Sequence, residues 1–356
     1  MPQTPRARAV ATVLAAASML SGCGGSDTDA PPSAAPQPAP LPAPPEPLPV
    51  SACPAGIETG DIIPSALAAP VCNSTQFDIH SDLAYASHGD ALLDLLVPRN
   101  ANAPAPLVVW IHGGGWQSGD KADRAQSQRL VCRGFALAAI NYRLSDTAPF
   151  PAQIQDVKAA IRFLRANAAT YGLDPERIAV FGSSAGGHLA ALAGTSGDVV
   201  GFDAPVLGNA TISSRVQVVV DWYGPTRLVE MDAQARAQGC PVGSARHSTA
   251  DSAESRLLGC TLGDAACAAA AQRADPSTYA DSTDPPHLLL HGTADCVSPG
   301  AQSALLAQAL ASGGACAVHR RVTGAGHGGA AWTTPEVQDA VAEFLERTLA
   351  SPSPSP

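Results

Sequence analysis

The chain has 356 residues, of which 46% are hydrophobic and 15% charged, so it has enough apolar material for a sizeable core and is not disordered throughout. Its net charge of −10 argues against binding to nucleic acid, which depends on Lys and Arg side chains that neutralise phosphates. Nine cysteines favour an oxidising compartment. No apolar run reaches the roughly 18 residues that span a bilayer, which excludes a multi-pass membrane protein.

The N-terminal residues predict export. Arg6 and Arg8 precede an apolar stretch over residues 9–20, which is too short to span a bilayer and is typical of a signal peptide. The stretch leads into LSGC, which resembles the bacterial lipobox, where the signal is cut before the cysteine and the thiol is acylated. We therefore expect a signal peptide over 1–22 and a lipid anchor on Cys23. An ordinary signal peptide followed by a chance cysteine is the alternative.

The lipobox resemblance also implies a location. It predicts an exported bacterial lipoprotein, periplasmic or on the cell surface, and Gly24 after the cysteine implies the outer membrane. Ten prolines lie between Pro31 and Pro49, a composition that favours extended polyproline II over a packed core. Residues 23–50 are therefore expected to be a lipidated tether, residues 51–350 the folded domain, and residues 351–356 a Ser/Pro tail.

Strand and helix patterns alternate along the domain. The run LVVWI is continuously apolar, as expected of a strand covered on both faces. The alternation predicts an α/β fold with a mainly parallel sheet flanked by helices. Around 225–285 the pattern weakens, and an excursion of this length predicts a small cap. Strands are predicted over 77–79, 91–97, 107–111, 135–140, 178–181, 216–220, 288–290 and 318–322, and helices over 154–168, 188–193 and 337–349.

The strongest chemical motif is GSSAG at residues 182–186. It matches G-x-S-x-G and stands between a predicted strand and a predicted helix, the context in which a serine sits on a sharp, strained turn. Glycines are needed there because side chains at their positions would clash. Ser184 is therefore the candidate nucleophile, and the alternative is a Gly/Ser-rich turn without chemistry.

A second glycine-rich motif, HGGGW at residues 112–116, directly follows the strand LVVWI. Consecutive glycines let the backbone approach a reacting carbonyl and point N–H groups at the developing oxyanion. We expect the oxyanion hole to consist of the N–H groups of Gly113, Gly114 and Ala185, with His112 orienting the loop. A hinge or plain turn is the alternative.

A serine hydroxyl needs a base, and the base needs an orienting carboxylate. Of nine histidines, His327 lies in the glycine-rich loop GAGHGG after the last predicted strand. Asp295 lies just beyond the preceding strand, so the order along the chain is Ser, Asp, His, as in the G-x-S-x-G hydrolases. The catalytic candidates are therefore Ser184, Asp295 and His327. A solvated turn aspartate and a surface histidine are the alternatives.

Together these motifs resemble those of the α/β-hydrolase esterases. The resemblance rests on HGGGW followed by SGD, NYRL at 141–144, YGLDP at 171–175, GSSAGGH at 182–188 and DWYGP at 221–225, and it covers nearly all of 75–348. The group includes hormone-sensitive-lipase-like carboxylesterases, and the match is closer to the feruloyl and acetyl-xylan esterase-like branch. The sequence departs from the family pattern at two places. Arg227 stands where the family usually has an acidic residue, and Ser298-Pro299 stands where it usually has Val-Pro. Both are expected near the side of the site that receives the acyl or leaving group.

Aromatic and cysteine residues allow further expectations. Trp116, Trp222 and Tyr223 stand next to motif glycines and are candidates to contact a sugar or aryl ring, with core packing as the alternative. Without Cys23, eight cysteines remain, an even number that suggests disulfides in an exported protein. Proximity along the chain favours Cys53–Cys72, Cys260–Cys267 and Cys296–Cys316, with Cys132 as a free core thiol. No spacing typical of zinc ligands occurs, and we expect neither a metal nor a cofactor.

The sequence thus predicts an α/β-hydrolase fold and a serine carboxylic-ester hydrolase that acts through a Ser-His-Asp triad and an acyl-enzyme. The expected substrates are short-chain or carbohydrate-linked acetyl or feruloyl esters. A peptidase or an arylformamidase on the same fold is one alternative, and a non-catalytic surface binding module is another. All three candidate triad members are present in order, which favours the enzyme.

Overall fold

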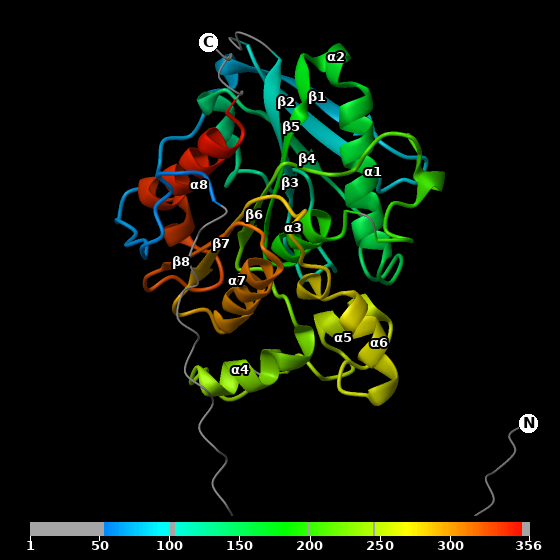
Figure 1. Cartoon of the computed structure of the whole chain (residues 1–356), viewed down its shortest axis with the longest axis vertical. Coiled ribbons are helices and arrows are strands. Elements are labelled where there is room, and N and C mark those ends of the chain that lie inside the picture. The colour runs from blue at the N-terminus through cyan, green and yellow to red at the C-terminus, as the bar shows by residue number, and fades with distance from the viewer. Residues whose placement is uncertain (1–52, 100–103, 198, 245, 351–356) are drawn as a thin grey trace, which may run out of the picture. The chain divides into compact units, whose positions relative to one another are not determined.

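An eight-stranded sheet forms the centre of the domain (Figure 1). The computed structural model describes residues 53–99, 104–197, 199–244 and 246–350, so the predicted signal peptide, the whole tether with Cys23, and the Ser/Pro tail lie outside the described residues. The strands are β1 (Phe77–Ala84), β2 (Leu92–Pro98), β3 (Ala105–Ile111), β4 (Ala136–Ile140), β5 (Leu173–Ser183), β6 (Val218–Trp222), β7 (His287–Gly292) and β8 (Ala317–Val322).

The strand order is β1-β2-β4-β3-β5-β6-β7-β8. β2 pairs antiparallel with both β1 and β4, and the remaining pairs are parallel. The predicted α/β fold with a mainly parallel sheet is therefore confirmed. Parallel neighbours present their carboxyl ends at one edge of the sheet, where ligands bind in open α/β sheets.

Helices cover both faces of the sheet, which explains the continuous apolar strands. Leu107 and Val109 of β3 belong to one hydrophobic cluster, and Val108 and Trp110 belong to another on the opposite face. α1 (Ala152–Ala166), α3 (Ala185–Thr195) and α7 (Ala301–Gly313) pack on the first face, while α8 (Pro335–Thr348) and the 3₁₀ helix η2 (Gln128–Arg133) pack on the second.

Two helical segments differ from the sequence prediction. The helix predicted over 154–168 divides at Asn167 into α1 and a short α2 (Ala168–Tyr171), which Gly172 ends in a left-handed conformation (φ 67°). α7 is not predicted from the sequence, because small and apolar residues lie all around it and no apolar stripe stands out. Further 3₁₀ turns are η1 (Ser74–Gln76), η3 (Pro205–Leu207) and η7 (Ala330–Thr333).

The predicted cap is a helical insertion between β6 and β7. It contains η4 (Leu228–Glu230), α4 (Met231–Ala237), α5 (Ala253–Leu258), η5 (Ala265–Cys267), α6 (Ala268–Arg273) and η6 (Pro276–Thr278). The cap helices gather beyond one end of the sheet (Figure 1). α5 reaches the HGGGW loop, since a Cβ atom built on Gly115 would lie 3.3 Å from Cβ of Ala253.

The disulfide pairs correct the proximity expectation. Cys260–Cys267 is present, but the other bonds are Cys53–Cys316, Cys72–Cys132 and Cys240–Cys296. The fold decides this pairing. The N-terminal segment runs along β8, where the Ile62 N–H donates to the Arg321 carbonyl oxygen at 2.8 Å, and this brings Cys53 beside Cys316. Cys132, which lies on η2, forms a disulfide with Cys72, so the prediction of a free core thiol is wrong.

Among the described residues, none of the helices combines the length and the apolar character needed to cross a membrane.

Candidate active site

Ser184 lies on the turn between β5 and α3 with φ 56° and ψ −122°, a strained conformation for a residue with a side chain. Its N–H donates to the Trp222 carbonyl oxygen at 2.8 Å, which ties the turn to β6. The flanking glycines permit the turn, because a Cβ atom on Gly182 would collide with the Gly186 carbonyl and one on Gly186 would collide with the Ile111 carbonyl. The turn therefore presents the serine hydroxyl at the N-terminus of α3.

The structure brings the three candidate catalytic side chains together. His327 Nε2 lies 2.7 Å from Ser184 Oγ, and its Nδ1 lies 2.7 Å from Asp295 Oδ2. An ionised carboxylate only accepts hydrogen bonds, so Nδ1 carries the proton and Nε2 accepts from the serine hydroxyl. The three residues come from the carboxyl ends of β5, β7 and β8. This is the geometry that a Ser-His-Asp triad requires, with a ring nitrogen beside the serine hydroxyl and a carboxylate on the other ring nitrogen.

Asp295 is fully buried and its carboxylate is held on both oxygens. Oδ1 accepts the N–H groups of Val297 at 2.8 Å and Ser298 at 3.0 Å, and Oδ2 faces His327, with Nε2 of His291 at 3.6 Å. Burial alone raises the pKa of this carboxyl, but hydrogen bonding and electrostatic attraction from the His291 and His327 rings outweigh it and hold the pKa well below its usual range. Asp295 is therefore an ionised acceptor at neutral pH.

The HGGGW loop lies against the candidate nucleophile, Ser184. A Cβ atom built on Gly113 would lie 3.3 Å from Cβ of Ser184, and Gly114 has φ 103°, which favours glycine. No hydrogen bond within the described part of the chain uses the N–H of Gly113, Gly114 or Ala185. These three donors can therefore stabilise an oxyanion beside Ser184.

His112 stacks on Tyr142 at 4.5 Å, and its Nδ1 lies 2.8 Å from the Gly113 carbonyl oxygen. The Tyr142 hydroxyl donates to the carbonyl oxygen of His112 at 3.1 Å. Burial lowers the pKa of His112. These contacts suit the predicted role of orienting the loop.

The three aromatic candidates for substrate contact are buried. Trp116 is 2% exposed and lies edge-on to His188, while Trp222 has no exposure and packs between Phe181 and Trp332. They offer no open surface for a sugar or aryl ring, and core packing describes their positions.

Tyr223 is 3% exposed but belongs to the site. Its ring meets the His327 ring edge-on at 4.7 Å and the Trp332 ring at 4.4 Å. Trp332, which no sequence motif marks, donates from Nε1 to the Gly326 carbonyl oxygen at 3.0 Å. The two rings therefore brace the histidine loop.

Arg227 and Ser298, at which the sequence departs from the family pattern, both make polar contacts within the protein. Arg227, at the start of η4, forms ion pairs with Asp275 and Glu230, each at 3.0 Å, and so ties the beginning of the cap to its end. Ser298 is 2% exposed, and its N–H holds the Asp295 carboxylate. Ser298 therefore leaves no surface for an acyl or leaving group and instead orients the acid.

Asp221 is a buried carboxyl below the Ser184 turn, and sequence reasoning gives it no role. Oδ1 accepts the Gly224 N–H at 2.8 Å, while Oδ2 has no hydrogen-bond partner within the described residues. Burial raises the pKa of Asp221 to about 6, although the Gly224 N–H and His291 act in the opposite direction. The motif DWYGP contains Asp221, but the motif does not show that this carboxyl is buried, because the burial results from the packing of α3 on β6.

Replacement of Asp221 by Asn is expected to stabilise the protein in a pH-dependent way. Between pH about 4 and about 6 the native state binds more protons at Asp221 than the unfolded state, so the free energy of unfolding falls as pH rises through this window. Asn keeps the acceptor for Gly224 and cannot ionise. The variant should match wild type near pH 4 and exceed it near pH 7.5 by up to about 3 kcal/mol. Thermal unfolding of wild type and variant from pH about 4 to about 7.5 measures this difference in stability. A difference that does not change with pH would contradict the prediction.

No group of three or more His, Cys, Asp or Glu side chains suited to a metal ion occurs among the described residues.

Comparisons with known proteins identify the family of the chain. The BD-FAE family model matches residues 93–310. The chain is 32% identical over 275 residues to esterase LipQ of Mycobacterium tuberculosis, an alignment that covers 74% of this chain and 61% of LipQ. The chain thus spans less than two thirds of that relative.

Two solved structures are similar over most of the chain. A truncated carbohydrate esterase from gut microbiota has a TM-score of 0.70 and 29% identity, with 79% of this chain and 100% of that chain covered. Propionate-bound esterase Est2 of Thermogutta terrifontis has a TM-score of 0.60 and 25% identity, with 79% and 97% covered. Because the family match extends over more than half of the chain and the sheet has the order described above, the chain belongs to the BD-FAE family of α/β-hydrolase esterases.

Proposed function

We propose that the protein is a serine carboxylic-ester hydrolase that acts on short-chain or carbohydrate-linked esters. The observation that carries the proposal is the placement of His327, 2.7 Å from both Ser184 Oγ and Asp295 Oδ2, beside three backbone N–H groups that donate to no acceptor in the described part of the chain. Esterase LipQ and the gut carbohydrate esterase, to which the chain is similar, support the reaction class.

The geometry supports a two-step acyl transfer. Ser184 Oγ attacks the ester carbonyl carbon while its proton passes to Nε2 of His327, and Asp295 stabilises the resulting imidazolium. The carbonyl oxygen gains the negative charge and accepts hydrogen bonds from Gly113, Gly114 and Ala185. When the tetrahedral intermediate collapses, the bond to the alcohol oxygen breaks and His327 returns the proton to that oxygen.

The acyl-enzyme is then hydrolysed by the same groups in reverse. His327 removes a proton from water as the water oxygen attacks the acyl carbon, and the bond to Ser184 Oγ breaks as the proton returns to that oxygen. A carboxylic acid and the free serine result. No cofactor enters either step.

The cap supports a short acyl group. Its larger apolar side chains are turned inward: Leu228 and Met231 are 1% and 2% exposed and Leu257 is fully buried, while Val229 stays 54% exposed. A long-chain lipase needs an extended apolar trough, since each buried CH₂ contributes only about 0.8 kcal/mol. The similar Est2 structure was obtained with propionate bound, which is a short-chain carboxylate.

Esters of p-nitrophenol with acyl chains of different length test the proposal. We expect the acetate or butyrate to be hydrolysed at least about tenfold better than the palmitate by kcat/KM, a difference of about 1.4 kcal/mol in transition-state binding. A serine-directed phosphonate should abolish the activity and label Ser184. Equal or better turnover of the palmitate would identify a surface lipase instead, and absence of turnover with every ester would contradict the function itself.

We also propose that the enzyme is anchored to the membrane as an exported lipoprotein through Cys23. The basic residues, the short apolar stretch and LSGC support this location, although they lie outside the described residues. Cys23→Ser should prevent lipidation and move the active enzyme out of the detergent-soluble membrane fraction, as measured by fractionation and activity. Wild-type protein free in the medium with a different N-terminus would contradict the anchor.

A further inference from the structure

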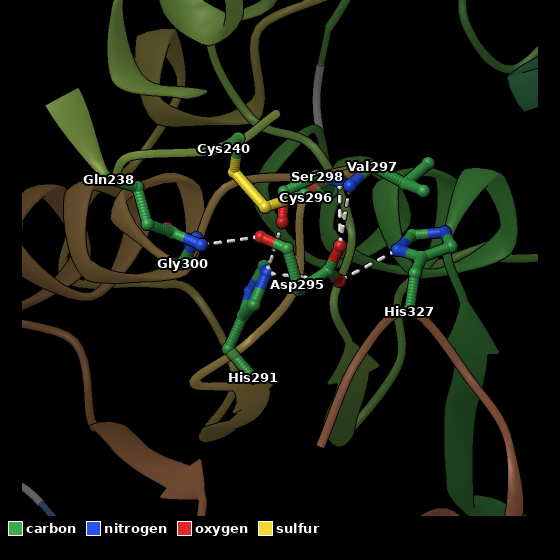
Figure 2. The surroundings of a disulfide bond; sticks show 9 residues. All are labelled: Gln238, Cys240, His291, Asp295, Cys296, Val297, Ser298, Gly300 and His327. Carbon is green, nitrogen blue, oxygen red and sulfur yellow. Dashed lines mark hydrogen bonds and ion pairs between the residues drawn. A yellow bond between two sulfur atoms is a disulfide. The ribbon is translucent and has the colours of Figure 1, made fainter. Parts of the chain in front are cut away.

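The loop that carries Asp295 is held by the cap at several points (Figure 2). The side-chain amide of Gln238 bridges the loop, because its Nε2 donates to the Asp295 carbonyl oxygen at 2.5 Å and its Oε1 accepts the Gly300 N–H at 3.1 Å. Cys296, the next residue after the acid, forms a disulfide with Cys240. Both ties come from the segment just after α4.

The segment after α4 is itself fixed. The N–H of Gly239 donates to the Arg236 carbonyl oxygen at 3.1 Å and that of Cys240 to the Ala235 carbonyl oxygen at 3.0 Å, which closes the helix end. Within the fold, Gln302 of α7 has no exposure, and its Nε2 donates to Oε1 of Gln234 in α4 at 2.6 Å. This hydrogen bond links α4 to α7, so the segment after α4 has a fixed place beside the loop between β7 and α7.

The ties fall on the residues that determine where the carboxylate lies. On the sheet side, Nε2 of His291 donates to the Ser298 carbonyl oxygen at 2.8 Å. On the cap side, Gln238 and the disulfide hold residues 295, 296 and 300. Figure 2 shows Gln238 and His327 on opposite sides of Asp295. A loop held on one side only would let the carboxylate move relative to His327.

We propose that Gln238 and the Cys240–Cys296 disulfide form a clamp by which the cap positions Asp295 for catalysis. These are positioning residues, since neither reaches Ser184 and both act through the acid. The inference rests on the proposed function. An acid displaced by about 1 Å no longer orients the imidazole, and misplacement of this size can cost up to about 10²-fold in rate.

Two variants of the full chain test the clamp, and two others serve as controls. Cys240→Ser/Cys296→Ser should reduce kcat for p-nitrophenyl acetate about tenfold, and Gln238→Leu somewhat less, with KM within about twofold because the acyl site is untouched. Cys260→Ser/Cys267→Ser, which removes the other cap disulfide, should leave kcat near wild type. Gln272 is an exposed glutamine on α6, and Gln272→Leu is the matched control for Gln238→Leu.

The deciding measurement is a double-mutant cycle with Asp295→Asn. If the clamp acts through the acid, Gln238→Leu and the double serine variant should cost less than about twofold in kcat once Asp295 is already replaced. Equal losses in both backgrounds would show a general structural role and overturn the inference. Unchanged kcat in the single background would also overturn it. Gln238→Leu keeps all disulfides and decides the question alone if the double serine variant does not fold.

The cycle separates the two proposals. Wild type that hydrolyses the ester and loses activity in Ser184→Ala supports the proposed function whatever the clamp variants do. Inactive wild type would contradict the function and the clamp together, whereas active wild type with additive losses contradicts the clamp alone.

Discussion

Replacement of Ser184 or His327 by Ala is expected to reduce ester hydrolysis by about 10³-fold or more. The two side chains act as a unit, so removal of either abolishes the transfer of the serine proton and leaves only the oxyanion donors and substrate binding. The double variant should therefore be little worse than either single variant. Initial rates with p-nitrophenyl acetate measure this.

Ser183→Ala is the matched control for Ser184→Ala. Ser183 precedes the nucleophile in the same turn, is 7% exposed, and stands at the variable position of the motif. Its loss should leave most of the activity. Substantial activity in a folded Ser184→Ala variant, or loss of activity only in Ser183→Ala, would contradict the mechanism.

Asp295→Asn is expected to reduce kcat by about 10²- to 10⁴-fold while the fold stays intact. The buried carboxylate accepts two backbone N–H groups on one oxygen and faces Nδ1 of His327 with the other. An Asn amide must turn its NH₂ group either toward the donors of Val297 and Ser298 or toward His327. In the first orientation donors oppose one another, and in the second the imidazole is held in the wrong tautomer.

The variant is compared with wild type by kcat, KM and thermal unfolding. A surface replacement, Asp146→Asn, serves as control because Asp146 is exposed in the loop before α1. Full activity in Asp295→Asn would show that another group orients His327, and the assignment of the acid would then be wrong.

Much of the site could be predicted because its motifs are local. G-x-S-x-G and HGGGW need glycines where the backbone takes a left-handed conformation or approaches another chain segment, and these requirements are written into a few adjacent residues. Gly182, Gly186 and Gly114 occupy such positions. Asp295 and His327 could be selected because each follows a strand, and parallel strands bring their carboxyl ends together.

The roles of the aromatic residues depended on packing across the sheet. Trp222 and Tyr223 are neighbours in the sequence, yet one lies in the core beside Phe181 and the other contacts His327. Tyr223 has φ 47°, so its side chain leaves the alternation of the strand. Nothing in composition or spacing distinguishes the two rings.

By itself, the sequence determined the fold class, the order of the candidate nucleophile, acid and base, and the glycine-rich loop beside Ser184, since short-range backbone requirements specify each of them. Only the tertiary structure decided which cysteines pair and what the cap does to Asp295. Cys240 and Cys296 are 56 residues apart in the sequence. They come together because the fold places the end of α4 beside the loop between β7 and α7, where a hydrogen bond links α4 to α7. Such contacts arise from packing between distant segments. The residues that adjoin a cysteine or glutamine in the sequence do not identify its partner in the fold.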